Sequence, residues 1–197
     1  MLVLVFDTET SGLPSKGDVS PETWPHIVQF SFVFVDTDTG KHEAHDFILK
    51  GPFELPDEVV RIHGITKRRS DACGFDFKDV FAIFSVYLAR AEFLVAHNIE
   101  FDLNMLRVEC MRAGLPFDEK ALPVKYCTMK KNVDRCGLLT ERGTAKFPKL
   151  IELYRHCFQE EPQALHNSLV DTYACLRCFY HCVVGTDAPK SVVRCIR

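Results

Sequence analysis

The chain begins with an apolar segment that ends in acidic residues. Residues 2–6 form a continuous run of leucine, valine and phenylalanine, which predicts a central strand buried on both faces of a sheet. Asp7 and Glu9 stand at the end of this strand. Because side chains alternate along a strand, both carboxylates point to one face, with Cα atoms roughly 6 to 7 Å apart. That arrangement suits a pair of cations at the carboxyl edge of the sheet; alternatively, the two acids only cap the strand end.

The pattern of the remaining segments predicts an α/β fold. Further strands are expected where short apolar runs occur, at residues 26–35, 41–49, 93–96 and 124–127. Helices are expected where apolar residues recur with a helical period, at residues 56–62, 75–90, 101–113, 149–158 and 168–183. The first three strands follow one another without a helix, and helices and strands alternate after them. This order predicts a mixed five-stranded sheet with helices on both faces.

Length and composition indicate a globular protein with one core. The 197 residues fit one domain, expected over residues 1–185, with a frayed C-terminal tail over residues 186–197. Hydrophobic residues make up 47% and charged residues 26%, which excludes a disordered chain, a collagen-like chain and a coiled coil. No apolar stretch approaches the roughly 18 residues that a membrane helix needs, so no membrane partner is expected.

The cysteines and the N-terminal residues predict an intracellular protein, in the cytoplasm or the nucleus. Nine cysteines without framework spacing are expected to be reduced thiols. Cys175, Cys178 and Cys182 share one helical face and are expected to pack against the sheet rather than bind zinc. Residues 1–6 are too short for the apolar core of a secretory signal. The formal charge of −3 argues against a static coat protein on DNA or RNA, but it allows an enzyme that meets phosphates through bound cations.

Two further acids and one histidine are candidates for the same edge of the sheet. Asp102 follows the predicted strand at residues 93–96, at the start of the next helix, where it alternatively only interacts with the helix dipole. Asp171 lies in Ser168-Leu-Val-Asp171, which has the pattern of a capping box, so this acid alternatively closes a helix end. His166 precedes Asp171 by five residues and projects from the approach to that helix or from its first turn.

Three groups of residues occur in a fixed order along the chain. They are Asp7-Thr-Glu9-Thr-Ser-Gly-Leu13, then His97-Asn-x-x-Phe-Asp102, then His166-x4-Asp171. Together they resemble the three motifs of the DEDDh 3′–5′ exonucleases, the family that includes the proofreading epsilon subunit of bacterial DNA polymerase III, RNase T and the TREX enzymes. The resemblance runs over residues 2–183 and includes residues 60–66 around His63, which are similar to the HGI segment of the family. Ser11 departs from the commoner threonine, and residues 15–25 look longer than in compact members.

This resemblance implies an RNase H-like fold and a metal-dependent active site. It implies two divalent cations, Mg²⁺ or Mn²⁺, held by four acids, Asp7, Glu9, Asp102 and Asp171. It also implies that His166 is the general base that takes a proton from the attacking water. The resemblance further implies that the terminal nucleotide is bound by Thr10, Leu13 and His63.

The residue types fit this chemistry independently of the resemblance. Hard cations prefer carboxylate oxygens, and two ions about 3.5 to 4 Å apart stabilise both the attacking and the leaving oxygen of an in-line phosphoryl displacement. Four crowded carboxylates repel one another when no metal is bound. Their ionisation is therefore expected to be coupled, and metal is expected to stabilise the fold.

We therefore expect a metal-dependent 3′–5′ exonuclease, a hydrolase that cleaves phosphodiester bonds at single-stranded or frayed 3′ ends and releases nucleoside 5′-monophosphates. DNA is favoured as the substrate, and proofreading or DNA repair as the setting. Two alternatives stay open: a 3′–5′ exoribonuclease that trims RNA, and a catalytically silent module that binds nucleic acid or a polymerase. The expected partner is the 3′ end of single-stranded DNA or RNA, with a polymerase or a second copy of the chain as further candidates.

The segment over residues 125–149 is basic in a chain that is acidic as a whole. It has two acids, Asp134 and Glu141, and seven basic residues, which give it a net charge of +5. The basic residues are Lys125, Lys130, Lys131, Arg135, Arg142, Lys146 and Lys149. Such a segment either tracks a phosphate backbone, with a contribution that weakens as salt rises, or is a solvated face.

Overall fold

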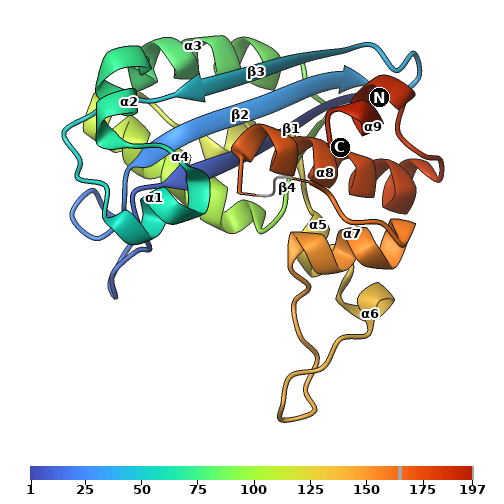
Figure 1. The fold of residues 1–197 in the computed structure, drawn as a ribbon. Helices are drawn as coiled ribbons and strands as arrows, with labels where there is room; N and C mark the ends of the chain where they lie inside the picture. Colours follow the sequence, from blue (N-terminus) through green and yellow to red (C-terminus); the bar gives the residue numbers. More distant parts are fainter. Residues whose placement is uncertain (164–165, 197) are drawn as a thin grey trace.

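The computed structural model describes residues 1–163 and 166–196 and contains a five-stranded mixed sheet (Figure 1). The strands are β1 (Leu2–Thr10), β2 (Ile27–Asp36), β3 (His42–Ile48), β4 (Phe93–Ala96) and β5 (Val124–Cys127). They lie in the order β3-β2-β1-β4-β5. β2 is antiparallel to β1 and β3, whereas β4 is parallel to β1 and β5. The predicted α/β, RNase H-like class is confirmed.

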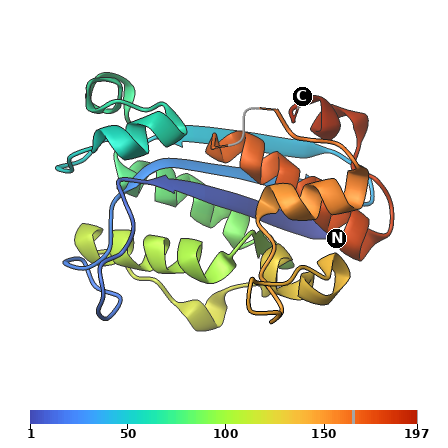
Figure 2. The ribbon, with the colours of Figure 1, turned by 60° about the horizontal axis from the view of Figure 1, so that its bottom comes forward.

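Helices cover both faces of this sheet, as predicted (Figures 1 and 2). α3 (Phe77–Leu88) and α4 (Ile99–Ala113) pack on the face that carries Leu4 and Phe6. α7 (Leu150–Phe158) and α8 (Ser168–Phe179) pack on the opposite face, which carries Val3 and Val5. β1 therefore lies between two layers of helices, and this position explains why an apolar run without polar alternation forms the central strand.

The other helices are short. They are α1 (Asp57–His63), α2 (Lys67–Cys73), α5 (Thr128–Lys131), α6 (Val133–Cys136) and α9 (Lys190–Arg194), with a 3-10 turn at Glu119–Ala121. α1 was predicted, but α2, α5, α6 and α9 were not, because so few residues do not establish a helical period. The predicted helix over residues 168–183 divides into α8 and a π-helical turn at Tyr180–Val184, which Gly185 ends with φ 81°. In the described part of the chain, no helix is both long and apolar enough to cross a membrane.

β1 is longer than its apolar run. The polar residues after Phe6 still pair with β2, as far as Thr10 opposite Ile27, and the register shifts between Glu9 and Thr10. Because β2 supplies backbone hydrogen-bond partners along this stretch, the polar residues keep an extended conformation. Asp7 and Glu9 therefore project from an ordered strand.

The C-terminal residues are packed, so the expectation of a frayed tail is wrong. Ala188, Val192 and Ile196 are buried, and they belong to the core that also contains side chains of α7, α8 and β1. The Gln163 backbone N–H donates to the Ile196 carbonyl at 3.0 Å. The three buried residues recur at every fourth position, which is the spacing of one helical face. The division into a domain at 1–185 and a separate segment at 186–197 stays a prediction.

Candidate active site

Three acids meet at the carboxyl end of β1. Asp7 and Glu9 lie on the same face of the strand as Val3 and Val5, which is the face that α8 covers. Asp171 lies in the first turn of α8. One carboxylate oxygen from each of these acids lies within 4.8 Å of the other two. The end of the strand and the start of the helix therefore bring together residues that are far apart in the sequence.

No other group of three or more histidine, cysteine, aspartate or glutamate side chains in the described chain holds its ligand atoms this close together. In the described chain, Cys175 and Cys178 of α8 and Cys182 of the following π-helical turn are not part of such a group. Cys175 and Cys178 are buried in the core against the sheet, as predicted. Cys182 is only partly buried, and its Sγ lies 4.0 Å from that of Cys157.

Asp102 approaches the same place from the opposite face of the sheet. It lies in the first turn of α4 and is 2% exposed. Its Oδ1 accepts a hydrogen bond from the Thr8 hydroxyl at 2.8 Å. It is not one of the three acids whose oxygens lie within 4.8 Å, but its charge contributes to raising the pKa of Asp7 and of Glu9. The four acids therefore form one acidic site, with three in closest contact.

All four carboxyl groups have raised pKa values, and burial is the largest cause for each. Burial together with repulsion from the neighbouring acids raises the pKa of Glu9 to about 8 and that of Asp7 well above its usual range. Hydrogen bonds from Thr8 to Asp102, and from the His166 backbone to Asp171, offset part of the increase. The charged form of this site is therefore costly for the protein alone.

The acidic site fits bound divalent cations. Asp171 Oδ1 is buried and has no hydrogen-bond partner in the described chain. None of the salt bridges among the described residues involves any of the four acids. Carboxylate oxygens are the donors that Mg²⁺ and Mn²⁺ prefer, and a cation would supply the positive charge that the protein does not.

The residues before α8 determine the position of Asp171. Asn167 caps the helix, because its side-chain oxygen accepts two backbone N–H groups of the first turn. The Ser168 hydroxyl donates instead to the Asp7 carbonyl at 2.7 Å. The capping-box interpretation of residues 168–171 is therefore wrong. Asp171 Oδ2 accepts the backbone N–H of His166 at 3.1 Å, and Oδ1 is left for another partner.

The backbone of His166 contacts the acidic site, because its N–H donates to Asp171. Its φ of 72° is in the left-handed region, which is uncommon for a residue other than glycine. Its side chain is exposed to solvent. Residues 164–165 lie outside the described part of the chain. The role of the His166 ring as a general base stays a prediction.

A pocket of about 510 Å³ opens next to Glu9. Its lining includes the three predicted nucleotide-binding residues, Thr10, Leu13 and His63. Two apolar side chains of the lining are exposed, Leu13 by 87% and Ile62 by 50%. The predicted substrate residues are therefore brought together, and they form a partly apolar pocket beside the acidic site.

His63 presents an unpaired polar atom in this pocket. Its Nδ1 accepts the Ile65 backbone N–H at 3.0 Å, so in the neutral ring the proton is assigned to Nε2. Nε2 is buried without a hydrogen-bond partner in the described chain. Burial lowers the pKa of His63, and the nearby Thr10 backbone offsets part of this shift without completing a hydrogen bond to Nε2. Because an unpaired buried donor costs roughly 1–3 kcal/mol, a bound group that accepts a hydrogen bond here would recover that energy.

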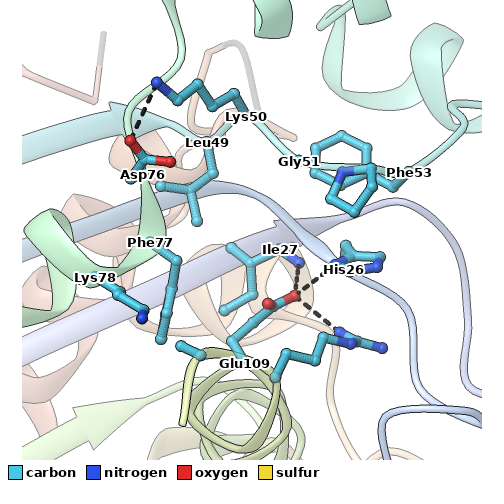
Figure 3. A pocket seen from close by; sticks show the side chains of 13 residues that line it. His26, Ile27, Leu49, Lys50, Gly51, Phe53, Asp76, Phe77, Lys78 and Glu109 are labelled. Carbon is cyan, nitrogen blue, oxygen red and sulfur yellow. Dashed lines mark hydrogen bonds and ion pairs between the residues drawn. The ribbon is translucent and has the colours of Figure 1, made fainter. Parts of the chain in front are cut away.

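Three residues that the sequence analysis missed hold the loop before β2; we call them the loop clamp (His26, Glu109 and Arg112). Glu109 Oε1 accepts the backbone N–H of Ile27 at 3.1 Å and lies 3.0 Å from His26 Nδ1 (Figure 3). It also accepts a hydrogen bond from Arg112 at 2.9 Å. Arg112 donates further to backbone carbonyls of the loop over residues 21–25. The one local signal in the sequence is the i,i+3 spacing of Glu109 and Arg112 on a helix.

The loop clamp fixes a segment that reaches the pocket beside Glu9. The His26 backbone N–H donates to the Ser11 hydroxyl at 2.9 Å, and the Ser11 N–H donates to the His26 carbonyl at 2.9 Å. Ser11 is followed by Gly12 and Leu13, which line the pocket. The clamp residues themselves line a second pocket of about 430 Å³. Through Glu109 and Arg112, α4 therefore supports the long loop that precedes β2.

Comparison with known proteins identifies the family. The chain matches the family model RNase_T, described as exonuclease, over residues 4–179. The DNA polymerase III subunit epsilon-like protein of Rhodobacter capsulatus is 34% identical over 121 residues, which cover 60% of this chain and 16% of that protein.

Solved structures of DNA-bound exonucleases share the fold. E. coli exonuclease I in complex with a dA16 oligonucleotide has a TM-score of 0.70 at 17% identity, and the match covers 91% of this chain and 40% of that one. Exonuclease X in complex with 5′-overhanging duplex DNA has a TM-score of 0.61 at 23% identity, over 94% of this chain and 95% of that one.

The chain thus spans well under half the length of the Rhodobacter relative and of exonuclease I, and nearly the full length of exonuclease X. The family model covers most of the chain, including the residues from β1 to α8 that carry the four acids. The chain therefore belongs to the RNase_T exonuclease family, which confirms its resemblance to the DEDDh 3′–5′ exonucleases and its class as a hydrolase.

Proposed function

We propose that this chain is a divalent-metal-dependent 3′–5′ exonuclease that removes terminal nucleotides from single-stranded or frayed 3′ ends, with DNA favoured over RNA. The products are nucleoside 5′-monophosphates. The observation that carries this proposal is the convergence of Asp7, Glu9 and Asp171 within 4.8 Å, directly beside a pocket that is open enough for a nucleotide.

The comparisons support a nucleic-acid substrate. Exonuclease I and exonuclease X, which share the fold, were both solved with DNA bound. The Rhodobacter relative is named as a polymerase subunit epsilon-like protein, so a polymerase stays a predicted partner of this chain. The 2′-hydroxyl is what distinguishes RNA from DNA at a given site. A comparison of trimming rates on DNA and RNA strands of the same sequence therefore tests the RNA alternative.

The acidic site would hold the metal ions. Asp7, Glu9 and Asp171 would be the ligands in closest contact, and Asp102 the fourth. When bound, two divalent cations stabilise negative charge on the attacking and the leaving oxygen of the phosphodiester. The protein contributes the placement of its carboxylates. Thr8 and the His166 backbone donate hydrogen bonds to the carboxylates of Asp102 and Asp171, and the Ser168 hydroxyl donates to the backbone carbonyl of Asp7.

The neighbouring residues would bind the terminal nucleotide and move the proton. Leu13 and Ile62 are exposed apolar side chains that can enclose the base or the sugar. His63 Nε2–H can donate to an oxygen of the nucleotide, since it has no partner in the described chain. His166 would take a proton from the attacking water, and its backbone hydrogen bond to Asp171 supports this role by holding the residue beside the acids.

Trimming of labelled strands tests this proposal. Single-stranded DNA and RNA of the same sequence, labelled at the 5′ end, are incubated with the protein and Mg²⁺, with and without chelator. We expect a ladder that shortens from the 3′ end, nucleoside 5′-monophosphates as products, and no reaction with chelator. Absence of metal-dependent mononucleotide release from either strand would contradict the proposal, and faster trimming of RNA would favour the exoribonuclease alternative.

A further inference from the structure

Residues 125–149 form an ordered projection, which we call the basic arm. β5 is its root in the sheet, α5 lies beside α7, and α6 and the hairpin after it extend below α7 in Figure 1 as a gold-to-orange projection. It comprises β5, α5, α6 and a hairpin in which Leu139 and Ala145 form an antiparallel bridge. The Thr140 N–H donates to the Thr144 carbonyl at 2.8 Å, and Gly143, with φ 75°, turns the chain at the tip. The arm is therefore a defined element.

One histidine fastens both ends of the basic arm beside the acidic site. His97 is hydrogen-bonded through Nε2 to the Pro148 carbonyl at 3.0 Å and through Nδ1 to the Thr128 hydroxyl at 2.9 Å. Burial lowers the pKa of His97 to about 4, so the ring is neutral at pH 7 and donates to the carbonyl. β1 and β4 pair in parallel as far as Val5 opposite Val95, and Asp7 and His97 each follow two residues after that pair. Thr128 lies one strand further, which places the root of the arm roughly 10 Å from Asp7.

The charge of the basic arm is opposite to that of the rest of the protein. Its net charge is +5, whereas the remaining residues, with 17 basic and 25 acidic side chains, carry −8. Within the described chain, Lys146 is the one cation of the arm that forms a salt bridge, with Glu152. The other six are exposed and have no acidic partner in the described chain: Lys125, Lys130, Lys131, Arg135, Arg142 and Lys149. The positive charge of the arm is therefore open to a polyanion.

The basic arm also exposes apolar side chains between its cations. Phe147 is 57% exposed and stands between Lys146 and the anchored residue Pro148. Leu139, on the other strand of the hairpin, is 64% exposed. An exposed aromatic ring among basic residues is the combination with which proteins bind unpaired nucleotides, because the ring stacks on a base while the cations contact phosphates.

We propose that the basic arm binds the single strand on the 5′ side of the terminal nucleotide, with its cations on the phosphates and Phe147 against an unpaired base. This inference rests on the proposed function and names the element that holds the strand outside the nucleotide pocket. The acidic site repels a polyanion, and the positive charge of the arm, whose root lies roughly 10 Å from Asp7, compensates for that repulsion. The arm therefore matters for long substrates and not for a single nucleotide.

Two variants with matched charge test the inference. The arm variant combines Lys130→Gln, Lys131→Gln and Arg142→Gln, all at exposed positions. The control variant combines three exposed substitutions near the opposite end of the sheet: Lys41→Gln, Lys190→Gln and Arg194→Gln. Both lose three positive charges. A third variant, Arg142→Glu, changes only the tip of the hairpin, where it does not disturb the fold.

Each protein is given substrates of two sizes with Mg²⁺. Thymidine 5′-(p-nitrophenyl phosphate) occupies the acidic site and its pocket alone, whereas single-stranded DNA and RNA of about 20 nucleotides also reach the arm. Binding of the same strands with uncleavable phosphorothioate 3′ ends is measured by fluorescence anisotropy over a range of salt concentrations. A duplex with a fully paired 3′ end is the comparison substrate.

For the arm variant we expect kcat/KM on the long single strand to fall roughly 10-fold or more, and the slope of log affinity against log salt to become shallower by about 2. Hydrolysis of the p-nitrophenyl ester should be unchanged, and the control variant should behave like the wild type. Arg142→Glu should show the same loss in weaker form. A loss on DNA, on RNA or on both supports the inference and identifies the strand that the arm meets.

Three results would contradict the inference. The first is an arm variant that equals the control on long single strands while both hydrolyse the small ester, which leaves the proposed function intact. The second is a loss confined to the paired duplex, which would place the arm on the complementary strand. The third applies if the wild type hydrolyses neither substrate, which means that the proposed function has failed. In that case, equal binding of the single strand by the arm and control variants contradicts the inference. Weaker binding by the arm variant than by the control variant supports it.

Discussion

Asp102 and Glu109 lie two turns apart on one side of α4, and both are buried, with 2% and 7% exposure. Glu109 has a cationic partner in Arg112, a backbone N–H and a histidine nitrogen. Asp102 has the Thr8 hydroxyl and faces other acids, and burial raises its pKa. The difference teaches that a buried acid paired with a protein cation holds structure together, whereas a buried acid without one is available to a cationic ligand.

The largest effect is expected from Asp7→Asn. Removal of one carboxylate charge from the acidic site should lower the metal-dependent trimming rate about 10³-fold, because metal stabilisation of the transition state is worth several kcal/mol. The same variant should unfold at equal or higher denaturant concentration in chelator, since it relieves repulsion with Glu9, Asp102 and Asp171. Single-turnover cleavage and denaturant unfolding measure the two effects. Full metal-dependent activity would remove Asp7 from the metal site; Asp79→Asn, at an exposed position on α3, is the control.

The acidic site also predicts how stability depends on pH. The pKa of Glu9 is about 8 in the folded chain and near 4.5 when unfolded, so the folded state binds more protons across this interval. The free energy of unfolding of the metal-free protein should therefore fall as the pH rises from 5 to 8, by on the order of 4 kcal/mol from Glu9 alone. Saturating Mg²⁺ should reduce the fall, and Glu9→Gln should flatten it. If the free energy of unfolding of the wild type fell with pH equally steeply with and without Mg²⁺, these acids would not be the metal ligands.

His166→Ala tests the residue whose ring has only a predicted role. We expect a loss of roughly 10²-fold in the single-turnover rate at saturating Mg²⁺, with little change in substrate affinity, because proton transfer by a positioned side chain contributes about that factor. His156→Ala, an exposed histidine of α7, should leave the rate unchanged. A rate for His166→Ala equal to that of the wild type refutes the general-base assignment.

The smallest effect is expected from a change at Glu109, the buried acid that has partners within the protein. Glu109→Gln should lower the free energy of unfolding by about 1–3 kcal/mol, because it weakens the buried hydrogen bonds to Arg112 and His26. It should raise KM for a single strand more than it lowers kcat, since the loop clamp supports the loop of Leu13. The exposed Glu119, which pairs with Arg107 of α4, gives the matched control, and Glu119→Gln should change stability by at most about 1 kcal/mol. Equal stability losses in the two variants would argue against the loop clamp.

Much of the sheet could be predicted from local patterns. β4 and β5 have the predicted boundaries, since each is a short apolar run between other elements. The packed C-terminal segment was missed although Ala188, Val192 and Ile196 are buried, because a helix as short as α9, which contains only Val192 of the three, carries little pattern of its own. The capping-box alternative for residues 168–171 was wrong, because Asn167 caps the helix and Ser168 bonds to β1. Local rules thus identified the elements better than they identified the partners of each polar side chain.

The sequence by itself determined that an apolar central strand would carry Asp7 and Glu9, and that Asp102, His166 and Asp171 would follow in order, because hydrophobic runs and motif spacing are local properties of the chain. Only the tertiary structure decided which buried acids are neutralised. Glu109 meets His26 across 83 positions, and Asp102 meets Thr8 across 94. It likewise decided that the basic arm is fastened beside the acidic site, through His97. Charge compensation depends on which side chains come together in space, and that is fixed only when distant segments pack.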